Sequence, residues 1–388
     1  MMSCPTILFL LSLYFILSEV PPLRFLLILV ISFVFVTVLM SSVSVHCRLT
    51  FFLLFLLYLI IAIFIRTNSL LVFFVMYELS LYPVCLLILL IGYQPEKIKS
   101  MLYLLLYTVV CSAPFLYFTL LTNLRLRSSL ASSTELAASL ICLSFMVKSP
   151  LYTLHLWLPK AHVEADVVGS MLLSGVMLKL GRYGLLILCP YLIGYTNLFV
   201  YLSLSGGVVC SVICCRCSDM KSLVAYSSVV HIGTVSLGGL SGLELGWWVS
   251  CGILVGHSLL SPLIFLLANE LYQVSGSRNF IYGHTSSVSY CLLFAICLCS
   301  GLNFGLPPFL NFWVEVSLFS LQGSLWSLSL LPLALTALLS FLYSILFYVL
   351  ACGGPCSVAL PACFSPYAFI PSLAFSLLLT FGSSVFLW

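Results

Sequence analysis

Long apolar runs follow one another along almost the whole chain, and they constrain its fold more than any other feature. A helix needs about 20 predominantly apolar residues to cross a bilayer. Thirteen such runs can be counted between residues 5 and 387. They are far longer than the ~10-residue alternating segments of transmembrane β-barrels. The pattern therefore predicts an all-α polytopic membrane protein with about 13 transmembrane helices.

Charged residues are scarce in this chain. They number 14 Lys and Arg and 10 Asp and Glu among 388 residues, or 6%, whereas soluble domains carry about 25%. So few charges cannot cover a soluble surface, and a net charge of +4 spread along the chain does not form a nucleic-acid-binding face. The composition excludes soluble, disordered and nucleic-acid-binding classes. It leaves membrane lipids and neighbouring helices as the expected surroundings.

The 17 cysteines do not form a metal-binding pattern. Most lie inside apolar runs, and no C-x₂-C pair recurs at the spacing of a zinc or iron–sulfur site. The chain also lacks a P-loop and a G-x-G-x-x-G turn. We therefore expect no metal, no nucleotide cofactor and no redox centre in this chain.

Four ionisable side chains lie in the middle of apolar runs. They are Glu78, Lys148, Lys179 and Glu315. A charge at mid-membrane costs about 2.5–3.5 kcal/mol on insertion scales, so exposure to lipid is excluded in practice. One interpretation is a set of buried ion pairs that only fix helix packing. The other, which the number of separate runs involved favours, is a pathway for protons or ions.

Two histidines, His231 and His257, also lie within apolar runs. Each alone could be a neutral core residue. Beside four intramembrane charges we predict a proton-relay role for both, because an imidazole can accept and donate a proton on opposite sides.

Two of the runs contain helix breakers at depth. Lys148-Ser149-Pro150 interrupts one, and the segment 303–308 interrupts another, seven residues before Glu315. A proline removes a backbone donor, and broken helices at corresponding positions of two halves indicate inverted repeats around a transport site. We predict two inverted five-helix repeats, 69–192 and 193–351, with a broken helix near 148–150 in the first and near 304–308 in the second. N-terminal helices (1–68) and a C-terminal helix (352–388) flank them.

Loop charge predicts an orientation. With thirteen helices, the loops on the N-terminal side hold seven Lys and Arg residues and the opposite loops hold four, which places the N-terminal side in the cytoplasm or matrix. The first twenty residues lack a basic leader, a clear cleavage site and Arg-rich amphipathic character. We expect them to form a retained first helix.

Four segments then resemble a known family. They are FMVKSPLYTLHLWLPKAHVEA (145–165), DMKSLVAYSSVVHIG (219–233), GHSLLSPLIFLLANELY (256–272) and LPPFLNFWVEVS (306–317). These segments resemble the chain 4 family of mitochondrial NADH:ubiquinone oxidoreductase, the antiporter-like proton-pumping subunits of respiratory complex I. The likeness runs from about Glu78 to Tyr348. Asp166 and Arg182 stand where the family often has proline and glycine.

The resemblance implies a core membrane subunit that moves protons across the mitochondrial inner membrane. It implies that NADH, FMN, iron–sulfur clusters and ubiquinone are bound by other subunits, and that the partners are other membrane-arm subunits, including neighbouring antiporter-like chains. It makes the chain part of a proton-translocating NADH:ubiquinone reductase. The residues that match the family's functional positions are Glu78, Lys148, Lys179 and Glu315, with His231 and His257 as the relay. In the family, the acid at the position of Glu78 pairs with the lysine at the position of Lys148, so the resemblance implies that pair here.

Two alternatives remain open from the sequence. Mrp-type cation/proton antiporter subunits share these motifs, although the short length and sparse charge favour the mitochondrial protein. A structural membrane subunit whose charges form inert ion pairs is the other. Ordered water joining the ionisable residues would distinguish a pump from that second alternative.

Overall fold

The computed structural model describes residues 22–41, 48–92, 94–122, 135–188, 197–279, 290–307 and 309–352, and within them every regular element is a helix. Eight of these helices, some of them joined end to end, are long and apolar enough to cross a membrane. The first and last predicted runs, 5–18 and 366–387, lie outside the described residues. An all-α polytopic membrane architecture is thus confirmed, and the number of thirteen crossings stays a prediction.

The first half of the chain contributes helices α2 to α10. Their bounds are α2 Pro22–Ser41, α3 Arg48–Arg66, α4 Leu70–Leu79, α5 Leu81–Ile91, α6 Lys97–Thr122, α7 Glu135–Lys148, α8 Trp157–Glu164, α9 Val167–Leu172 and α10 Leu178–Leu188. A π-helical turn, Leu173–Met177, joins α9 to α10 without a break. Apart from the short α8, each helix lies on a predicted apolar run.

The second half contributes helices α11 to α16. Their bounds are α11 Asn197–Arg216, α12 Met220–Leu240, α13 Glu244–Ser275, α14 Tyr290–Asn303, α15 Leu310–Leu325 and α16 Leu330–Cys352, with a short 3₁₀ turn at Ser327–Ser329. These helices also lie on predicted runs.

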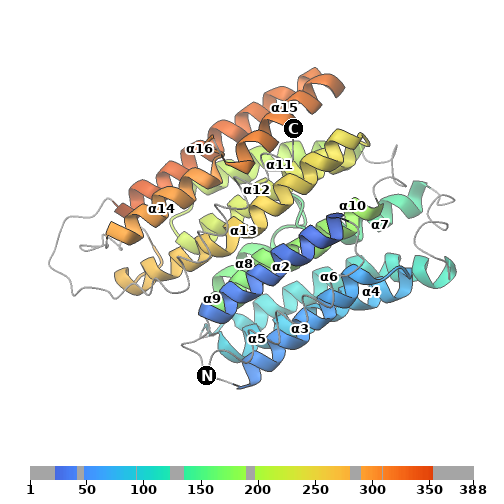
Figure 1. The fold of residues 1–388 in the computed structure, drawn as a ribbon, viewed down its shortest axis with the longest axis horizontal. Helices are drawn as coiled ribbons and strands as arrows, with labels where there is room; N and C mark the ends of the chain where they lie inside the picture. Colours follow the sequence, from blue (N-terminus) through green and yellow to red (C-terminus); the bar gives the residue numbers. More distant parts are fainter. Residues whose placement is uncertain are drawn as a thin grey trace.

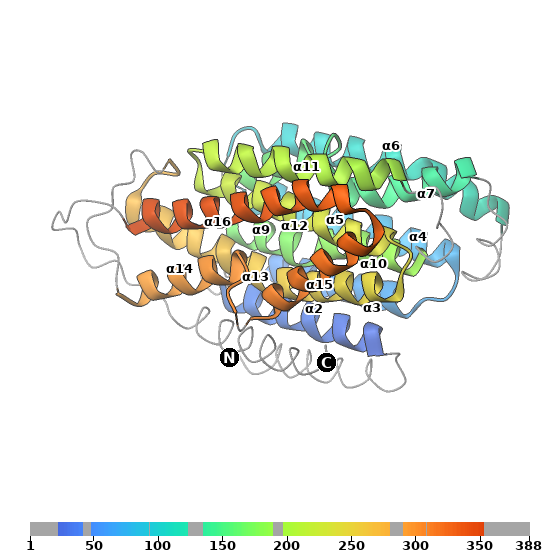
Figure 2. The same cartoon turned by 90° about the horizontal axis from the view of Figure 1, so that it is seen from above.

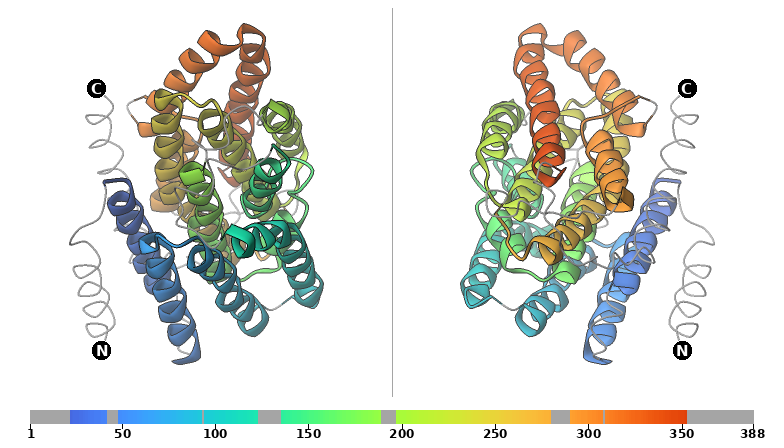
Figure 3. Two further views of the ribbon diagram at one scale, coloured as in Figure 1. Left: turned by 90° about the vertical axis from the view of Figure 1, so that its right-hand side faces the viewer. Right: turned by 90° about the vertical axis from the view of Figure 1, so that its left-hand side faces the viewer.

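The helices run in roughly one common direction, in layers that follow chain order. Figure 1 shows α3 to α6 on one side and α14 to α16 on the other, with α2 and α7 to α13 between them. Figure 2 shows the same bundle from above, and Figure 3 shows it from its two ends. The halves meet where α13 packs on α2, α9 and the π-helical turn, and where α12 packs on α8.

Burial divides the helices into inner and outer sets. The spans 167–188, α12 and α13 are almost wholly buried, whereas α6 and α16 expose most of their length. The exposed side chains of α6 and α16 are largely apolar, such as Val110 and Leu331. Apolar surface on this scale suits contact with lipid or with neighbouring membrane subunits.

Both predicted breaks are present, and they share one hydrogen-bonding pattern. The helix α7 ends at Lys148, with non-helical backbone from 149 to 156, and α14 ends at Asn303, with non-helical backbone before α15. After the first break the N–H of Leu151 donates to the Met146 carbonyl five residues back. After the second the N–H of Leu306 likewise donates to Gly301.

In each break a side chain from the segment after the break donates a hydrogen bond to the carbonyl of the residue that follows Met146 or Gly301. Trp157 Nε1 donates to the Val147 carbonyl at 3.0 Å, and Asn311 Nδ2 donates to the Leu302 carbonyl at 2.9 Å. Carbonyls freed in lipid need such partners. By this pattern Asn303 occupies in the second break the position that Lys148 occupies in the first.

An aromatic cluster fixes α7 against its neighbours. The Phe145 ring lies 5.2 Å from Tyr77, 5.1 Å from Phe115 and 6.2 Å from Phe73, measured between ring centroids. On its remaining side it packs directly on Gly184 of α10, where any Cβ atom would overlap the ring. The close approach of α7 and α10 therefore depends on the missing side chain at residue 184.

We predict that Gly184→Ala lowers the free energy of unfolding by about 1–3 kcal/mol, because the added methyl group overpacks a fully filled interface. Gly169→Ala is the matched control, since a Cβ there would lie 3.4 Å from Ala165 and Ile88, an ordinary contact. The control is expected to be neutral or stabilising by up to about 1 kcal/mol. Thermal unfolding of the detergent-purified protein measures both, and equal effects at the two sites would contradict the packing argument.

Candidate functional site

Glu78 and Lys148 form an ion pair in the first half of the bundle. Lys148 Nζ lies 3.2 Å from Glu78 Oε1, and the side chains are 3% and 18% exposed. Glu78 lies near the end of α4, just before the interruption at Ser80 that precedes Pro83 in α5. Lys148 is the last residue of α7. Each partner thus sits next to a place where the helix geometry is interrupted.

Tyr77 makes the remaining contacts to the ammonium group of Lys148. Nζ donates to the Tyr77 carbonyl at 2.5 Å, and it lies 3.3 Å from the centroid of the Tyr77 ring. The ammonium is therefore held by a carboxylate, a carbonyl and a π face. Its closest hydrogen bond goes to the carbonyl, so the carboxylate oxygen contributes chiefly its charge.

Lys179 lies two residues after the π-helical turn and is buried inside the bundle. Its Nζ donates to the carbonyl of Ser174 at 2.5 Å, approaches His257 Nδ1 at 2.9 Å and lies 3.4 Å from Ser261 Oγ. A π-helical turn inside an α-helix is frequent at functional sites. An ammonium group only donates, so His257 Nδ1 accepts and the Nε2 of the neutral ring carries the proton.

The two histidines predicted as a relay lie next to each other. The ring centroids of His231 and His257 are 5.5 Å apart. His231 Nε2 lies 3.2 Å from Asn303 Oδ1, and a carbonyl oxygen only accepts, so His231 Nε2 donates. Lys179, His257, His231 and Asn303 therefore form one continuous buried line across α10, α13, α12 and α14.

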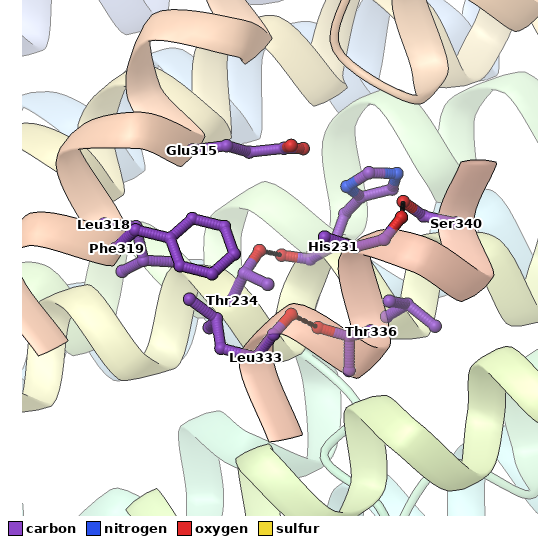
Figure 4. Close-up of a pocket in the computed structure, with 10 residues that line it drawn as sticks. His231, Thr234, Glu315, Leu318, Phe319, Leu333, Thr336 and Ser340 are labelled. Carbon is purple, nitrogen blue, oxygen red and sulfur yellow. Dashed lines mark hydrogen bonds between the residues drawn. The ribbon is translucent and has the colours of Figure 1, made fainter. Parts of the chain in front are cut away.

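Glu315 lies at the far end of this line. Its carboxylate packs over Gly305, which has φ +74°, and an oxygen of the carboxylate lies 3.1 Å from the place a Cβ of residue 305 would take. Glu315 and His231 line the same cavity, together with Thr234, Thr336 and Ser340. Figure 4 shows the carboxylate extending into this cavity toward the His231 ring. The two residues share a cavity without a direct hydrogen bond between them.

The predicted site residues are therefore brought together in two groups. One is the Glu78–Lys148 pair, and the other runs from Lys179 through both histidines to Glu315. No direct contact joins the groups in the described part of the chain. Between them lies Arg182, one turn after Lys179 and 2% exposed, whose Nη1 reaches Met146 Sδ at 3.7 Å while Nε and Nη2 have no hydrogen-bond partner.

Three site residues were not identified from the sequence alone. Tyr77 contacts Lys148, Ser261 lies beside Lys179, and Asn303 pairs with His231. An uncharged side chain in an apolar run gives no signal of function. Two of them could have been indicated by their position in the chain, because Tyr77 directly precedes Glu78 and Asn303 lies at the second helix break.

Metal binding has no support in the described residues. Among them no three His, Cys, Asp or Glu side chains lie close enough to hold a metal ion. Eleven of the cysteines in these ranges are free thiols.

Comparison with known proteins places this geometry in a family. The family model described as the transmembrane region of NADH:quinone oxidoreductases and Mrp antiporters matches residues 67–342. The chain belongs to this family. The match includes both broken helices and all six predicted site residues of the antiporter-like fold.

Two curated relatives share one name. NADH-ubiquinone oxidoreductase chain 4 of Ceratitis capitata is 40% identical over 72% of this chain and 66% of its own length. The protein of the same name from Artemia franciscana is 38% identical over 72% of this chain and 73% of its own length. The chain thus spans about two thirds of the length of the first of these relatives.

Solved structures share the antiporter-like fold at lower identity. A chain of respiratory complex I from Thermus thermophilus superposes with a TM-score of 0.83 at 22% identity, over 97% of this chain and 88% of that chain. A chain of the Mrp complex from a Dietzia species gives a TM-score of 0.78 at 20% identity, over 93% of this chain and 42% of that chain.

The buried Glu78–Lys148 pair predicts that substitutions of its two residues have non-additive effects on stability. Glu78→Gln leaves the Lys148 ammonium without its counter-charge, and removing one partner of a buried pair costs about 3–5 kcal/mol. Because Glu78 is partly exposed, we expect a value toward the lower end. The double variant Glu78→Gln with Lys148→Met is expected to lose less stability than the sum of the single changes, since it leaves no unpaired charge.

A double-mutant cycle on thermal unfolding of the purified protein measures this coupling. Lys99→Met on the exposed start of α6 serves as the control and is expected to stay within about 0.5 kcal/mol of the parent. Strictly additive effects of the two changes would show that the pair is not coupled.

Proposed function

We propose that this chain is a proton-translocating core subunit of respiratory complex I in the mitochondrial inner membrane. The family match and the shared name of the curated relatives support this assignment. In this proposal NADH oxidation and ubiquinone reduction, with FMN and iron–sulfur clusters, take place in other subunits. This chain contacts other membrane-arm subunits, including antiporter-like neighbours, through its apolar outer helices.

The observation that carries the proposal is the buried line of titratable groups. A proton can pass directly from the Lys179 ammonium to His257 Nδ1, because the two nitrogens are 2.9 Å apart. The neighbouring His231 ring and the cavity shared with Glu315 continue the line. Such groups at the centre of a membrane bundle are expensive to bury and are the usual components of proton relays.

The Glu78–Lys148 pair acts as the switch in this mechanism. While the carboxylate lies near Nζ, it stabilises the charged lysine. When the carboxylate moves away, the buried ammonium loses its counter-charge and releases its proton. Breaking a buried pair costs about 3–5 kcal/mol, which exceeds the ~2.3 kcal/mol needed to move one charge against 100 mV.

Proton transfer between the two groups requires water. Arg182 keeps its charge and stands between Lys148 and Lys179, so its unpaired Nε and Nη2 can each bind a water molecule. The free energy that opens the pair comes from quinone reduction and arrives through a neighbouring subunit.

The repeat assignment is part of this proposal. Residues 69–192 and 193–351 form two related halves, each with one broken helix. The matching hydrogen bonds at the two breaks, Trp157 to Val147 and Asn311 to Leu302, support it. Proton movement then takes place along the line where the halves meet.

Lys148→Met tests the switch. We expect at least a twofold loss of protons moved per NADH oxidised in the reconstituted complex, because methionine keeps the volume but cannot carry a proton. Dye-monitored acidification of proteoliposomes measures this, with Lys99→Met as the control at parent level. Undiminished pumping by a fully assembled Lys148→Met complex would favour a structural role for the charges.

An Mrp-type cation/proton antiporter is the second candidate function, favoured by the Mrp part of the family match and by the superposition on the Mrp complex. The two functions differ in their need for sodium. We expect pumping to be the same when Na⁺ is replaced by choline, because the titratable groups of the described line are one lysine, two histidines and one terminal carboxylate. Uptake of radioactive Na⁺ coupled to proton release would instead support the antiporter.

A further inference from the structure

Tyr343 of α16 carries a buried hydroxyl group without a hydrogen-bond partner. The side chain is 0% exposed, and its Oη has no partner within the described residues. It lines a second cavity, which we name the Tyr343 cavity, together with Ser227, Ser300, Asn303 and Ser344. Five polar side chains from three helices thus converge on one small space inside an apolar bundle.

The hydrogen bonds around the Tyr343 cavity leave one hydroxyl donor without an acceptor. The hydroxyl groups of Ser227, Ser300 and Ser344 each donate to a carbonyl of their own helix, at 2.8, 2.9 and 2.8 Å. Each serine oxygen therefore keeps lone pairs that can accept, while Tyr343 has a donor with nothing to receive it. A water molecule supplies what both need, because it accepts from Tyr343 and donates to serine oxygens. The cavity has room on the scale of a single water, the usual occupant of a polar internal space.

The Tyr343 cavity and the cavity that Glu315 and His231 line, named here the Glu315 cavity, lie at successive levels of the bundle. On α12 the Tyr343 cavity uses Ser227 and the Glu315 cavity uses Thr234, which lie about one turn on either side of His231. On α16 the order runs from Ser340 in the Glu315 cavity to Ser344 in the Tyr343 cavity. The Tyr343 cavity therefore lies toward the Met220 end of α12, and the Glu315 cavity lies toward the Leu240 end.

Asn303 stands at the boundary between the two spaces. It lines the Tyr343 cavity, and its Oδ1 receives the Nε2–H of His231, whose ring lines the Glu315 cavity. While this hydrogen bond holds, the proton of His231 Nε2 is shielded from water in the Tyr343 cavity. A turn of the amide toward that water would free Nε2.

We propose that the Tyr343 cavity holds an ordered water that binds Tyr343 and Asn303 and gives His231 a second proton connection, toward the Met220 end of the bundle. This inference rests on the proposed function and assigns a further step to it. In uptake, the ring first carries its hydrogen on Nδ1; an O–H bond of a protonated water breaks as the Nε2–H bond of His231 forms, and the resulting imidazolium passes its Nδ1 hydrogen on, which leaves the Nε2–H that Asn303 receives. Asn303 carries no proton and acts as a positioning residue.

The predicted orientation puts the Met220 end on the matrix side, so this connection would serve uptake and the Glu315 cavity would serve release.

A high-resolution map of the assembled parent complex gives the first test, and it needs no variant. We expect density for a water within hydrogen-bond distance of Tyr343 Oη and of Asn303. Its absence from a map that resolves other buried waters would overturn the proposal.

Tyr343→Phe gives the second test, because it removes only the hydroxyl. We expect the water to be lost and the protons moved per NADH to fall at least twofold, with unchanged assembly. Tyr117→Phe is the matched control, since Tyr117 is 67% exposed on α6. Asn303→Leu is expected to give a similar loss and to shift the pH profile of pumping, because His231 then loses the acceptor that fixes its proton.

The outcomes separate the two proposals. Normal pumping by Tyr343→Phe, with pumping lost in Lys148→Met, would overturn the water connection alone. Normal pumping by both variants would overturn the proposed function itself.

Discussion

A hydrocarbon environment offers no hydrogen bonds, and this constraint governs the whole structure. Backbone groups that leave a helix must find partners within the protein, and charged side chains must turn inward. Trp157 and Asn311 meet the first need at the two breaks. Tyr77, Ser174 and His257 meet the second around the two lysines. The polar line at the centre is the counterpart of the apolar surface outside.

The positions of the charges were predictable because they violate the apolar pattern. A lysine or glutamate within a long hydrophobic run is easily recognised wherever the run lies in the chain. Glu78, Lys148, Lys179 and Glu315 could therefore be selected from the sequence. The pairing of Glu78 with Lys148, separated by 70 positions, followed from the family resemblance. The helix breaks were predictable for a similar reason, since Pro150 and Pro307 cannot continue a helix with its full hydrogen bonding.

The contacts of these residues were less predictable, because they depend on how helices rotate against one another. Nothing in a run of apolar residues shows that the Tyr77 ring faces Lys148 or that Asn303 faces His231. The π-helical turn just before Lys179 could not be predicted from the apolar pattern either. The separation of the site into two groups, with Arg182 between them, is likewise a result of packing rather than of sequence spacing.

In the proposed relay, the hydrogen bonds of His257 limit how often a proton can pass. The ring receives from Lys179 at Nδ1 and carries its own hydrogen on Nε2. A proton that enters at one nitrogen and leaves from the other exchanges the tautomer of the ring. A second proton cannot follow by the same route until the imidazole has rotated or its hydrogen has returned. In the proposed relay, His257 must therefore return to its starting tautomer after each transfer, and until then it blocks the passage of another proton.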